Sequence, residues 1–306
     1  MASQASGWRL VIHGGAGVMP RGSISPEEEA DYRKGLMTAL DAGIGILTAG
    51  GLAIDAVQAA VVALENDPNF NAGHGAVLNR DGLAELDASI MDGRERKAGA
   101  VAQVRTVKNP VLAARLAMDT TPHVMFAGRE ADDLAAAGGL EIVDPAYFVT
   151  PKRVEQLKRV MAGEVKAWDR RGTVGAVARD SHRNLAAATS TGGMVAKAPG
   201  RIGDSPVIGA GTYADNASAA VSATGHGEMF IRAGVARMIC ARVELQGMSA
   251  QEAADVTLTD VRSLGGAGGV IVVTKDDAAM AMNTDGMFRG EADGAGRKIT
   301  AIYAGE

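Results

Sequence analysis

The stretch Gly172-Thr173-Val174-Gly175-Ala176-Val177-Ala178 decides how the fold is interpreted. From Val174 the residues are apolar, small or β-branched, and no turn signal appears before residues 180–183, a pattern typical of a buried strand. One interpretation is an ordinary strand that happens to begin with threonine. The other is that cleavage of the Gly172–Thr173 bond makes Thr173 an amino terminus. Its α-amine, with a pKa of about 8, would then accept the proton of its own hydroxyl.

Length and composition limit the class of protein. The 306 residues are 47% hydrophobic, which is enough for a substantial core in one or two domains. The net charge is −5, and basic residues gather only in 152–171, which argues against a nucleic-acid surface. The single cysteine, Cys240, excludes an intrachain disulfide framework and a cysteine-rich metal site, and its apolar surroundings indicate a packing role.

No targeting or membrane segment is expected. Residues 1–8 lack the apolar core of a secretory signal. The longest uncharged apolar run, 42–54, is interrupted by glycine and too short to cross a bilayer. We therefore expect a cytoplasmic protein without a membrane partner.

Helix and strand signals come in alternating blocks. Ser25 before Pro26 and three glutamates predicts a helix start, and Ser249 with Glu252 predicts a capping box. The block order favours layered sheets whose outer faces are covered by helices. The expected helices cover 26–49, 54–65, 110–118, 131–137, 228–245 and 250–264, and the expected strands cover 9–12, 83–91, 98–107, 174–179, 184–190, 218–223, the hairpin 269–282, and 299–303.

Two segments need separate interpretation. The strand at 9–12 leads into the glycine-rich segment His13-Gly14-Gly15-Ala16-Gly17. A phosphate-binding loop needs a helix directly after it, whereas Pro20 and Gly22 disfavour a helix here. We expect a tight turn there, with His13 held by backbone hydrogen bonds. The charged residues of 151–172 offer little to bury, so a flexible linker is expected.

After the linker, three strands border small, hydroxyl-rich turns. The first begins at Thr173, the second ends in 189–193, and the third ends in 223–227. Arg201 and Asp204 lie between the last two turns in the sequence. One threonine–glycine turn carries no functional signal, but three of them with an acid and a base predict a site assembled from strand ends.

The combination of motifs resembles the plant-type L-asparaginases, the isoaspartyl peptidase family of N-terminal nucleophile (Ntn) hydrolases. The likeness covers nearly the whole chain in the family's order. It implies an α+β fold, a four-layer αββα sandwich, as a single domain over 1–306. It also implies autocleavage into an α chain, 1–172, and a β chain, 173–306. The matching motifs are His13-Gly-Gly-Ala-Gly17, Asn71-Ala-Gly-His-Gly75, Leu86-Asp-Ala-Ser-Ile-Met-Asp-Gly93, Gly172-Thr-Val-Gly-Ala-Val177, Ser190-Thr-Gly-Gly193, Pro199-Gly-Arg-Ile-Gly-Asp-Ser205 and Thr224-Gly-x-Gly-Glu228.

The resemblance implies a role for each motif residue. Thr173 matches the nucleophile, and Thr191 matches the threonine that polarises it. Arg201 matches the clamp for a substrate α-carboxylate, for which a planar two-pronged donor is suited. Asp204 matches the partner of the α-ammonium. The remaining implied roles are the autocleavage bond after Gly172, the oxyanion hole at Thr224 and Gly225, a backbone contact to the α-ammonium at Gly227, and a place near the nucleophile for Asn71.

The resemblance also implies ions and partners. It implies no organic cofactor and one structural sodium ion, held by backbone carbonyls, the oxygen ligands that hard cations prefer. The substrates would be L-asparagine and isoaspartyl dipeptides, and the assembly would be a homodimer of processed α/β units. The implied sodium loop contains Leu64, Glu65, Asp67, Phe70, Ala72 and His74.

Two other functions remain open at this point. A glycosylasparaginase-like hydrolase would cleave the bond between a sugar and asparagine, but a single cysteine and the absence of a signal argue against a secreted enzyme of that kind. An uncleaved, non-catalytic binding or scaffold protein could also have this fold. In that case Thr191 would be a strand-end hydroxyl, Arg201 and Asp204 a surface ion pair, and Asn71 a turn residue.

Overall fold

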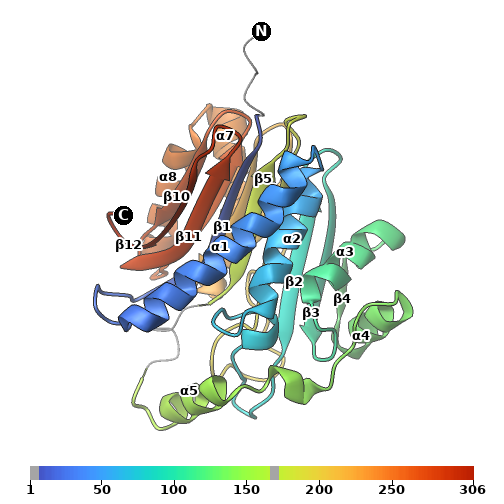
Figure 1. Ribbon diagram of the computed structural model, residues 1–306, viewed down its shortest axis with the longest axis vertical. Helices are drawn as coiled ribbons and strands as arrows, with labels where there is room; N and C mark the ends of the chain where they lie inside the picture. The colour runs from blue at the N-terminus through green and yellow to red at the C-terminus, as the bar shows by residue number, and fades with distance from the viewer. Residues whose placement is uncertain (1–6, 166–171) are drawn as a thin grey trace.

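A computed structural model describes residues 7–165 and 172–306, and in these residues the strands form two sheets (Figure 1). Neighbouring strands are antiparallel except for β3 and β4, which are parallel. The larger sheet has the order β12 (Lys298–Tyr303), β11 (Gly286–Asp293), β1 (Arg9–Gly17), β5 (Val174–Arg179), β6 (Leu185–Thr191), β2 (Leu86–Asp92), β3 (Lys97–Val104), β4 (Met125–Ala127). The smaller sheet has the order β10 (Ala278–Met282), β9 (Gly268–Thr274), β8 (Ala219–Gly225), β7 (Thr212–Ala214).

The two sheets pack face to face, and helices cover both outer faces. Helices α1 (Pro26–Thr48), α2 (Ala53–Asn66) and α3 (Pro110–Thr120) pack on the larger sheet, in front of it in Figure 1. Helices α7 (Val235–Gln246) and α8 (Ala250–Ser263) pack on the smaller sheet. Three apolar clusters fill the two helix–sheet layers and the space between the sheets. The predicted four-layer αββα sandwich is confirmed.

Capping boxes begin two of these helices, the one predicted at Ser249 and another at Ser25, where a helix start was predicted. Ser25 Oγ accepts the backbone N–H of Glu28, whose side chain accepts the N–H of Ser25. Ser249 and Glu252 make the same reciprocal contacts at the start of α8. Each box satisfies N–H groups that the first helical turn leaves without partners, so local sequence alone determines these two starts.

Two predictions about the second half of the chain are wrong. The helix expected over 228–245 is two helices, α6 (Gly227–Ala233) and α7, because Gly234 takes a left-handed conformation with φ +58° and ends the first. Strand β11 was not predicted, although it lies between β12 and β1. Its buried Arg289 and Glu291 obscure the apolar pattern. The Arg289 guanidinium donates to the Met287 and Tyr303 carbonyls.

The predicted linker is an ordered helix in its first part. Residues Pro151–Met161 form α5, with Thr150 as its cap. Arg153 is buried, and its Nε donates to the Gly75 carbonyl at 2.6 Å while Nη2 donates to the Asn69 carbonyl at 3.3 Å. Hydrogen bonds to backbone carbonyls thus stabilise a buried Arg153 guanidinium, which the charge pattern alone predicted to be exposed to solvent. The rest of the expected linker includes 166–171, which lie outside the described residues.

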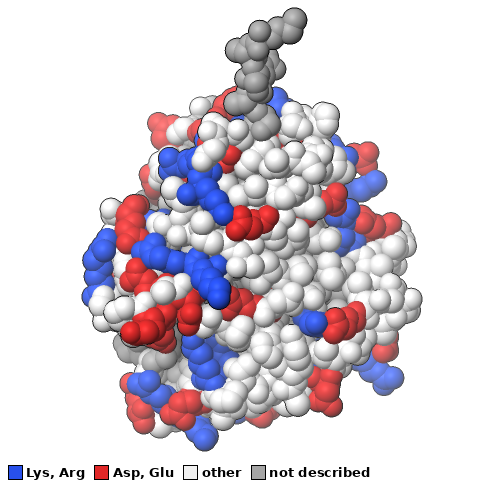
Figure 2. Space-filling model, in the orientation of Figure 1, with Lys and Arg blue, Asp and Glu red and all other residues white. Residues whose placement is uncertain are grey.

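The remaining elements are short and lie mainly at one end of the larger sheet. Figure 2 shows basic and acidic side chains interspersed over one face of the molecule. Ion pairs such as Arg33–Glu29 occur in the structure. Within 7–165 and 172–306, no helix is long and apolar enough to cross a membrane. The short elements are the helix α4 (Gly128–Ala137) and the 3₁₀ turns Gly73–Gly75 and Pro145–Phe148.

Candidate active site

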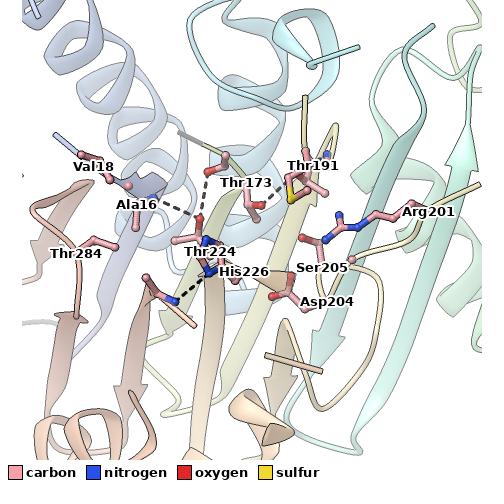
Figure 3. A pocket seen from close by; sticks show the side chains of 17 residues that line it. Ala16, Val18, Thr173, Thr191, Arg201, Asp204, Ser205, Thr224, His226 and Thr284 are labelled. Atoms are coloured by element: carbon pink, nitrogen blue, oxygen red, sulfur yellow. Dashed lines mark hydrogen bonds between the residues drawn. The ribbon is translucent and has the colours of Figure 1, made fainter. Parts of the chain in front are cut away.

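A cavity of about 70 Å³ lies where strands from both sheets end (Figure 3). Residues far apart in sequence line it, and the three hydroxyl-rich turns predicted to meet all contribute. One water molecule needs roughly 10–15 Å³ of cavity volume measured in this way, so the cavity has room for a small ligand. The lining residues are Ala16, Gly17, Val18, Gly172, Thr173, Thr191, Gly193, Met194, Arg201, Gly203, Asp204, Ser205, Thr224, Gly225, His226, Ala267 and Thr284.

Thr173 lies immediately before β5 and is hydrogen-bonded to the end of the neighbouring strand β6. Its Oγ1 donates to Thr191 Oγ1 at 3.1 Å, and Thr191 Oγ1 also accepts the Gly193 N–H at 2.9 Å. Thr173 has φ +51°, an unfavourable conformation for a β-branched residue that costs on the order of 1–3 kcal/mol. The backbone is therefore strained at the residue predicted to be the nucleophile.

The carbonyl of Gly172 faces a donor from the smaller sheet. Thr224 Oγ1, at the end of β8 and buried, donates to the Gly172 oxygen at 3.1 Å. Gly15 passes beside the same carbonyl with φ +106°, and a Cβ there would lie 2.0 Å from the Gly172 oxygen. A hydroxyl that donates to this carbonyl can stabilise negative charge developing on its oxygen, which is the chemistry of an oxyanion hole. Gly225 lines the cavity beside Thr224.

Arg201 and Asp204 lie on the loop between β6 and β7. Arg201 donates from Nε and Nη2 to the two carboxylate oxygens of Glu228, at 2.9 and 3.0 Å. Burial raises the pKa of Asp204 to about 7, and its Oδ2 has no hydrogen-bond partner among the described residues. Gly227 makes room for both, since a Cβ there would lie 2.9 Å from Arg201 Nη2 and from Asp204 Oδ1. A buried carboxylate without a partner favours a cationic ligand.

Asn71 is not among the residues that line this cavity. Its Nδ2 donates to the Gly193 carbonyl at 2.8 Å, and its Oδ1 accepts the Val77 N–H at 2.8 Å. It lines a second cavity, of about 470 Å³, on the side of Gly14 and Arg153. Asn71 nevertheless lies near the predicted nucleophile, since a Cβ on Gly172 would be 3.3 Å from its Nδ2, and it braces the loop after Thr191. The other predicted catalytic and substrate-binding side chains line the first cavity.

The predicted sodium loop turns its backbone inward around two glycines. A Cβ on Gly75 would lie 2.1 Å from the Phe70 oxygen and 2.7 Å from the Pro68 oxygen, and a Cβ on Gly73 would lie 2.4 Å from the Glu65 oxygen. The two glycines thus let backbone carbonyls of this loop pack closely, and carbonyl oxygens are the ligands that a hard cation such as sodium prefers. No cluster of three or more His, Cys, Asp or Glu side chains in the described residues could hold a metal.

The side chain of Glu65 connects this loop to the cavity. Its Oε1 accepts from Ser190 Oγ at 2.7 Å and from the Val111 N–H at 3.0 Å. Burial raises the pKa of this carboxyl to about 7, while these hydrogen bonds favour the ionised form. Because Ser190 directly precedes Thr191, the loop supports the strand end that carries the predicted partner of the nucleophile.

Sequence reasoning missed the side chains behind Thr173. His13 belongs to strand β1 rather than to a turn, and it is fully buried. Its Nδ1 lies 3.1 Å from the Thr173 carbonyl and its Nε2 lies 2.9 Å from Ser222 Oγ, so only one of its two contacts is to backbone. The available signal was the alternation of Val11 and His13, which places both on the face between the sheets.

Comparison with known proteins agrees with this geometry. The family model described as asparaginase matches residues 6–302. The chain belongs to the asparaginase family. Among its relatives in that family, the isoaspartyl peptidase of Salmonella typhimurium is 47% identical over 306 aligned residues, covering 96% of this chain and 98% of the relative. The isoaspartyl peptidase of Escherichia coli is also 47% identical, covering 96% and 95%. The human isoaspartyl peptidase/L-asparaginase is 46% identical, covering 87% and 86%.

Proposed function

We propose that this protein is an autoprocessing amidohydrolase with an N-terminal threonine nucleophile. It hydrolyses the side-chain amide of L-asparagine and the isopeptide bond of β-aspartyl dipeptides, and it releases L-aspartate. The observation that carries the proposal is the pair of contacts around one peptide bond. The Thr173 hydroxyl donates a hydrogen bond to the Thr191 hydroxyl, and the Gly172 carbonyl accepts a hydrogen bond from the Thr224 hydroxyl. The names of the relatives support the substrate class.

Autocleavage follows from that arrangement. Thr173 Oγ1 attacks the Gly172 carbonyl carbon, and the oxyanion accepts the hydrogen bond from Thr224. The proton of the hydroxyl passes to the Thr173 nitrogen, the C–N bond breaks to release a free amine, and Gly172 remains as an ester on the threonine oxygen. Water then hydrolyses the ester, giving an α chain of 172 residues and a β chain of 134. Cutting the bond removes the constraint that imposes φ +51° on Thr173, so the strain favours the product.

Turnover uses the same groups with the new amine as base. The α-amine of Thr173 takes the proton of its hydroxyl, which attacks the side-chain carbonyl of the substrate. Ammonia or an amino acid leaves with a proton, and water releases aspartate from the ester. Arg201 binds the α-carboxylate and Asp204 the α-ammonium. Since both ends of the α-amino-acid head are held there, the bond presented to Thr173 lies on the side chain.

The proposal extends to the ion, the assembly and the location. Sodium bound by carbonyls of the 64–74 loop would hold the shape of the loop that Glu65 links to Ser190. We also propose, from family likeness alone, a homodimer of processed α/β units in the cytoplasm. No step of the reaction is assigned to the ion.

Mass spectrometry of incubated protein, combined with kinetics, tests the proposal. We expect two fragments, the smaller beginning at Thr173, and aspartate release from L-asparagine and β-Asp-Leu. Activity on glycosyl-asparagine alone would favour the glycosylasparaginase alternative. An intact chain that binds these compounds without hydrolysing them would favour a non-catalytic protein, and either result would contradict the proposal.

A further inference from the structure

A buried polar network lies directly behind the candidate active site. It consists of His13, Ser89, Thr189, Thr212 and Ser222, all of which have 0% exposure. Successive side chains are joined by short contacts from one sheet to the other. These are Ser89 Oγ to Thr212 Oγ1 at 2.8 Å, Thr212 to Thr189 at 2.5 Å, Thr189 to Ser222 at 2.6 Å, Ser222 to His13 Nε2 at 2.9 Å, and His13 Nδ1 to the Thr173 carbonyl at 3.1 Å.

On two strands, a residue of this network lies two positions before a predicted catalytic threonine and faces the same side of the sheet. Side chains two residues apart on a strand share a face. Along β6 the inward face runs from Ala187 to Thr189 to Thr191, and along β8 it runs from Ala220 to Ser222 to Thr224. Ala187 and Ala220 belong to the apolar cluster between the sheets. The interior thus changes from apolar, to the buried polar network, to the active site.

The network has one consistent direction of donation. The carbonyl of Thr173 can only accept, so His13 Nδ1 carries the proton and donates. Burial lowers the pKa of His13 to about 3, so the ring is neutral and its Nε2 accepts from Ser222. Ser222 then accepts from Thr189, although Thr189 also lies 3.2 Å from the Gly211 carbonyl. Thr189 in turn accepts from Thr212, which starts the direction, because the Ser89 hydroxyl also lies 2.6 Å from the Ser205 carbonyl, a group that can only accept.

We propose that the buried polar network is a positioning device for the nucleophile. It holds the His13 ring through Nε2, and the Nδ1–H of that ring holds the Thr173 carbonyl so that the Thr173 hydroxyl stays on Thr191. His13, Thr189 and Ser222 are positioning residues, because none of them touches the cavity. The inference concerns both autocleavage and turnover, and in that respect it rests on the proposed function.

Gly175 provides independent support. A Cβ at this position of β5 would lie 2.0 Å from Ser222 Oγ and 2.4 Å from His13 Nε2. The hydrogen bond between Ser222 and His13 therefore fills the space that a side chain would occupy in an ordinary strand. This explains why the residue two places after Thr173 is glycine, although glycine inside a strand costs stability.

Breaking the network has a specific consequence. Without the donor at Ser222, Nε2 loses the hydrogen bond that fixes the orientation of the His13 ring. The ring can then tilt, the bond from its Nδ1–H to the Thr173 carbonyl weakens, and Thr173 is displaced. A displacement of about 1 Å at a reacting group can lower a rate roughly 100-fold.

Matched variants test the proposal. Thr189→Val and Ser222→Ala interrupt the network, whereas Thr189→Ser retains the hydroxyl. Thr257→Val is the control, since Thr257 is equally buried but donates within α8 to the Ala253 carbonyl. We expect the two interrupting variants to lower the autocleavage rate and kcat roughly 10- to 100-fold, with KM changed less than about 2-fold. Thr189→Ser and the control should retain wild-type rates.

Nitrogen NMR of ¹⁵N-histidine-labelled protein reads the tautomer directly. The chain has five histidines, and the His13 signals are identified by their loss in His13→Gln. We expect the proton on Nδ1 in both proteins, and in Ser222→Ala a shift of the Nε2 signal, because that nitrogen loses its hydrogen bond. A wild-type ring protonated on Nε2 would overturn the inference, as would unchanged rates in both interrupting variants or equal losses in Thr257→Val. Failure to cleave and to hydrolyse any substrate contradicts the proposed function instead, since the tautomer is measured without activity.

Discussion

The two ends of the candidate active site are built differently. At the nucleophile end, Thr173, Thr191 and Thr224 lie at the ends of strands from both sheets, and hydrogen bonds within the chain already occupy their hydroxyls. At the clamp end, Arg201 and Asp204 lie on the loop between β6 and β7. Asp204 Oδ2 is buried with no partner in the described part of the chain.

This difference indicates a division of labour. The nucleophile end acts first on the chain itself, so its geometry must be complete before any ligand arrives. In the proposed mechanism the clamp end has no part in autocleavage, and the charges of the substrate complete it. Variants at the nucleophile end should therefore reduce both cleavage and kcat, whereas variants at the clamp end should raise KM and leave cleavage intact.

The largest effect is expected for Thr173→Ala, which removes the nucleophile of both reactions. It should leave the chain uncut and release no ammonia from L-asparagine, as measured by denaturing gel and ammonia assay. Thr173→Ser is the matched control, because it keeps a hydroxyl and should cleave and turn over at reduced rates. Cleavage of the alanine variant at the same bond would contradict the assignment of the nucleophile.

Thr224→Val should show the next largest effect. It keeps the shape of the side chain but removes the donor that lies 3.1 Å from the Gly172 carbonyl. Loss of one oxyanion donor lowers kcat by about 10²- to 10³-fold, and we expect the autocleavage rate to fall by a similar factor with little change in KM. Single-turnover kinetics and timed gels measure the two losses. A fall in only one of them would mean that the two reactions do not share this donor.

The comparison also shows what the sequence could predict. The sequence predicted that the turns carrying Thr173, Thr191 and Thr224 would meet, because strand-ending motifs are local, and all three residues line one cavity. Their roles came from the family resemblance. His13 was misjudged because its function depends on Ser222, which is 209 residues away in sequence. Arg153 was assigned to solvent because the carbonyls that bury it come from a distant loop. Strand patterns indicated the layers, but pairings between remote polar groups require the tertiary structure.

Asp204→Asn tests the clamp end. Burial raises the pKa of Asp204 to about 7 in the ligand-free protein, whereas the substrate ammonium needs the ionised carboxylate. The kcat/KM of the processed wild type should therefore fall as pH decreases below about 7. The variant should lose roughly 100-fold in kcat/KM, the magnitude expected when one partner of a buried charge pair is removed. Its kcat/KM should fall less steeply at low pH than that of the wild type, because only the α-amine of Thr173 then remains to be protonated. Autocleavage should proceed normally.

Asp204 should also affect stability in a predictable direction. A carboxyl with a raised pKa binds its proton more tightly in the folded chain, so its stabilising contribution is greatest below the unfolded pKa of about 4 and is lost as pH rises to about 7. At pH 8 the ligand-free Asp204→Asn variant should therefore have a higher Tm than the wild type. Differential scanning calorimetry at pH 5 and pH 8 measures the change, and a lower Tm at pH 8 would mean that the carboxylate has a partner in the folded protein.

The smallest effect, and the finest test of the clamp, is expected for Glu228→Gln. Glu228 binds the Nε and Nη2 edge of the Arg201 guanidinium, at 2.9 and 3.0 Å. The Nη1 and Nη2 end is left for a substrate carboxylate, since a guanidinium has donors enough for two bidentate partners.

If Glu228 orients Arg201, its loss weakens a half-exposed ion pair worth at most about 1 kcal/mol, which corresponds to a KM increase of roughly 2- to 5-fold at constant kcat. If Glu228 instead occupies the place of the substrate carboxylate, the variant should lower KM. Glu244→Gln, which removes the surface pair with Arg237 at 3.3 Å, is the control and should leave KM unchanged. The sign of the KM change thus shows whether Glu228 orients Arg201 for the substrate carboxylate or competes with that carboxylate for Arg201.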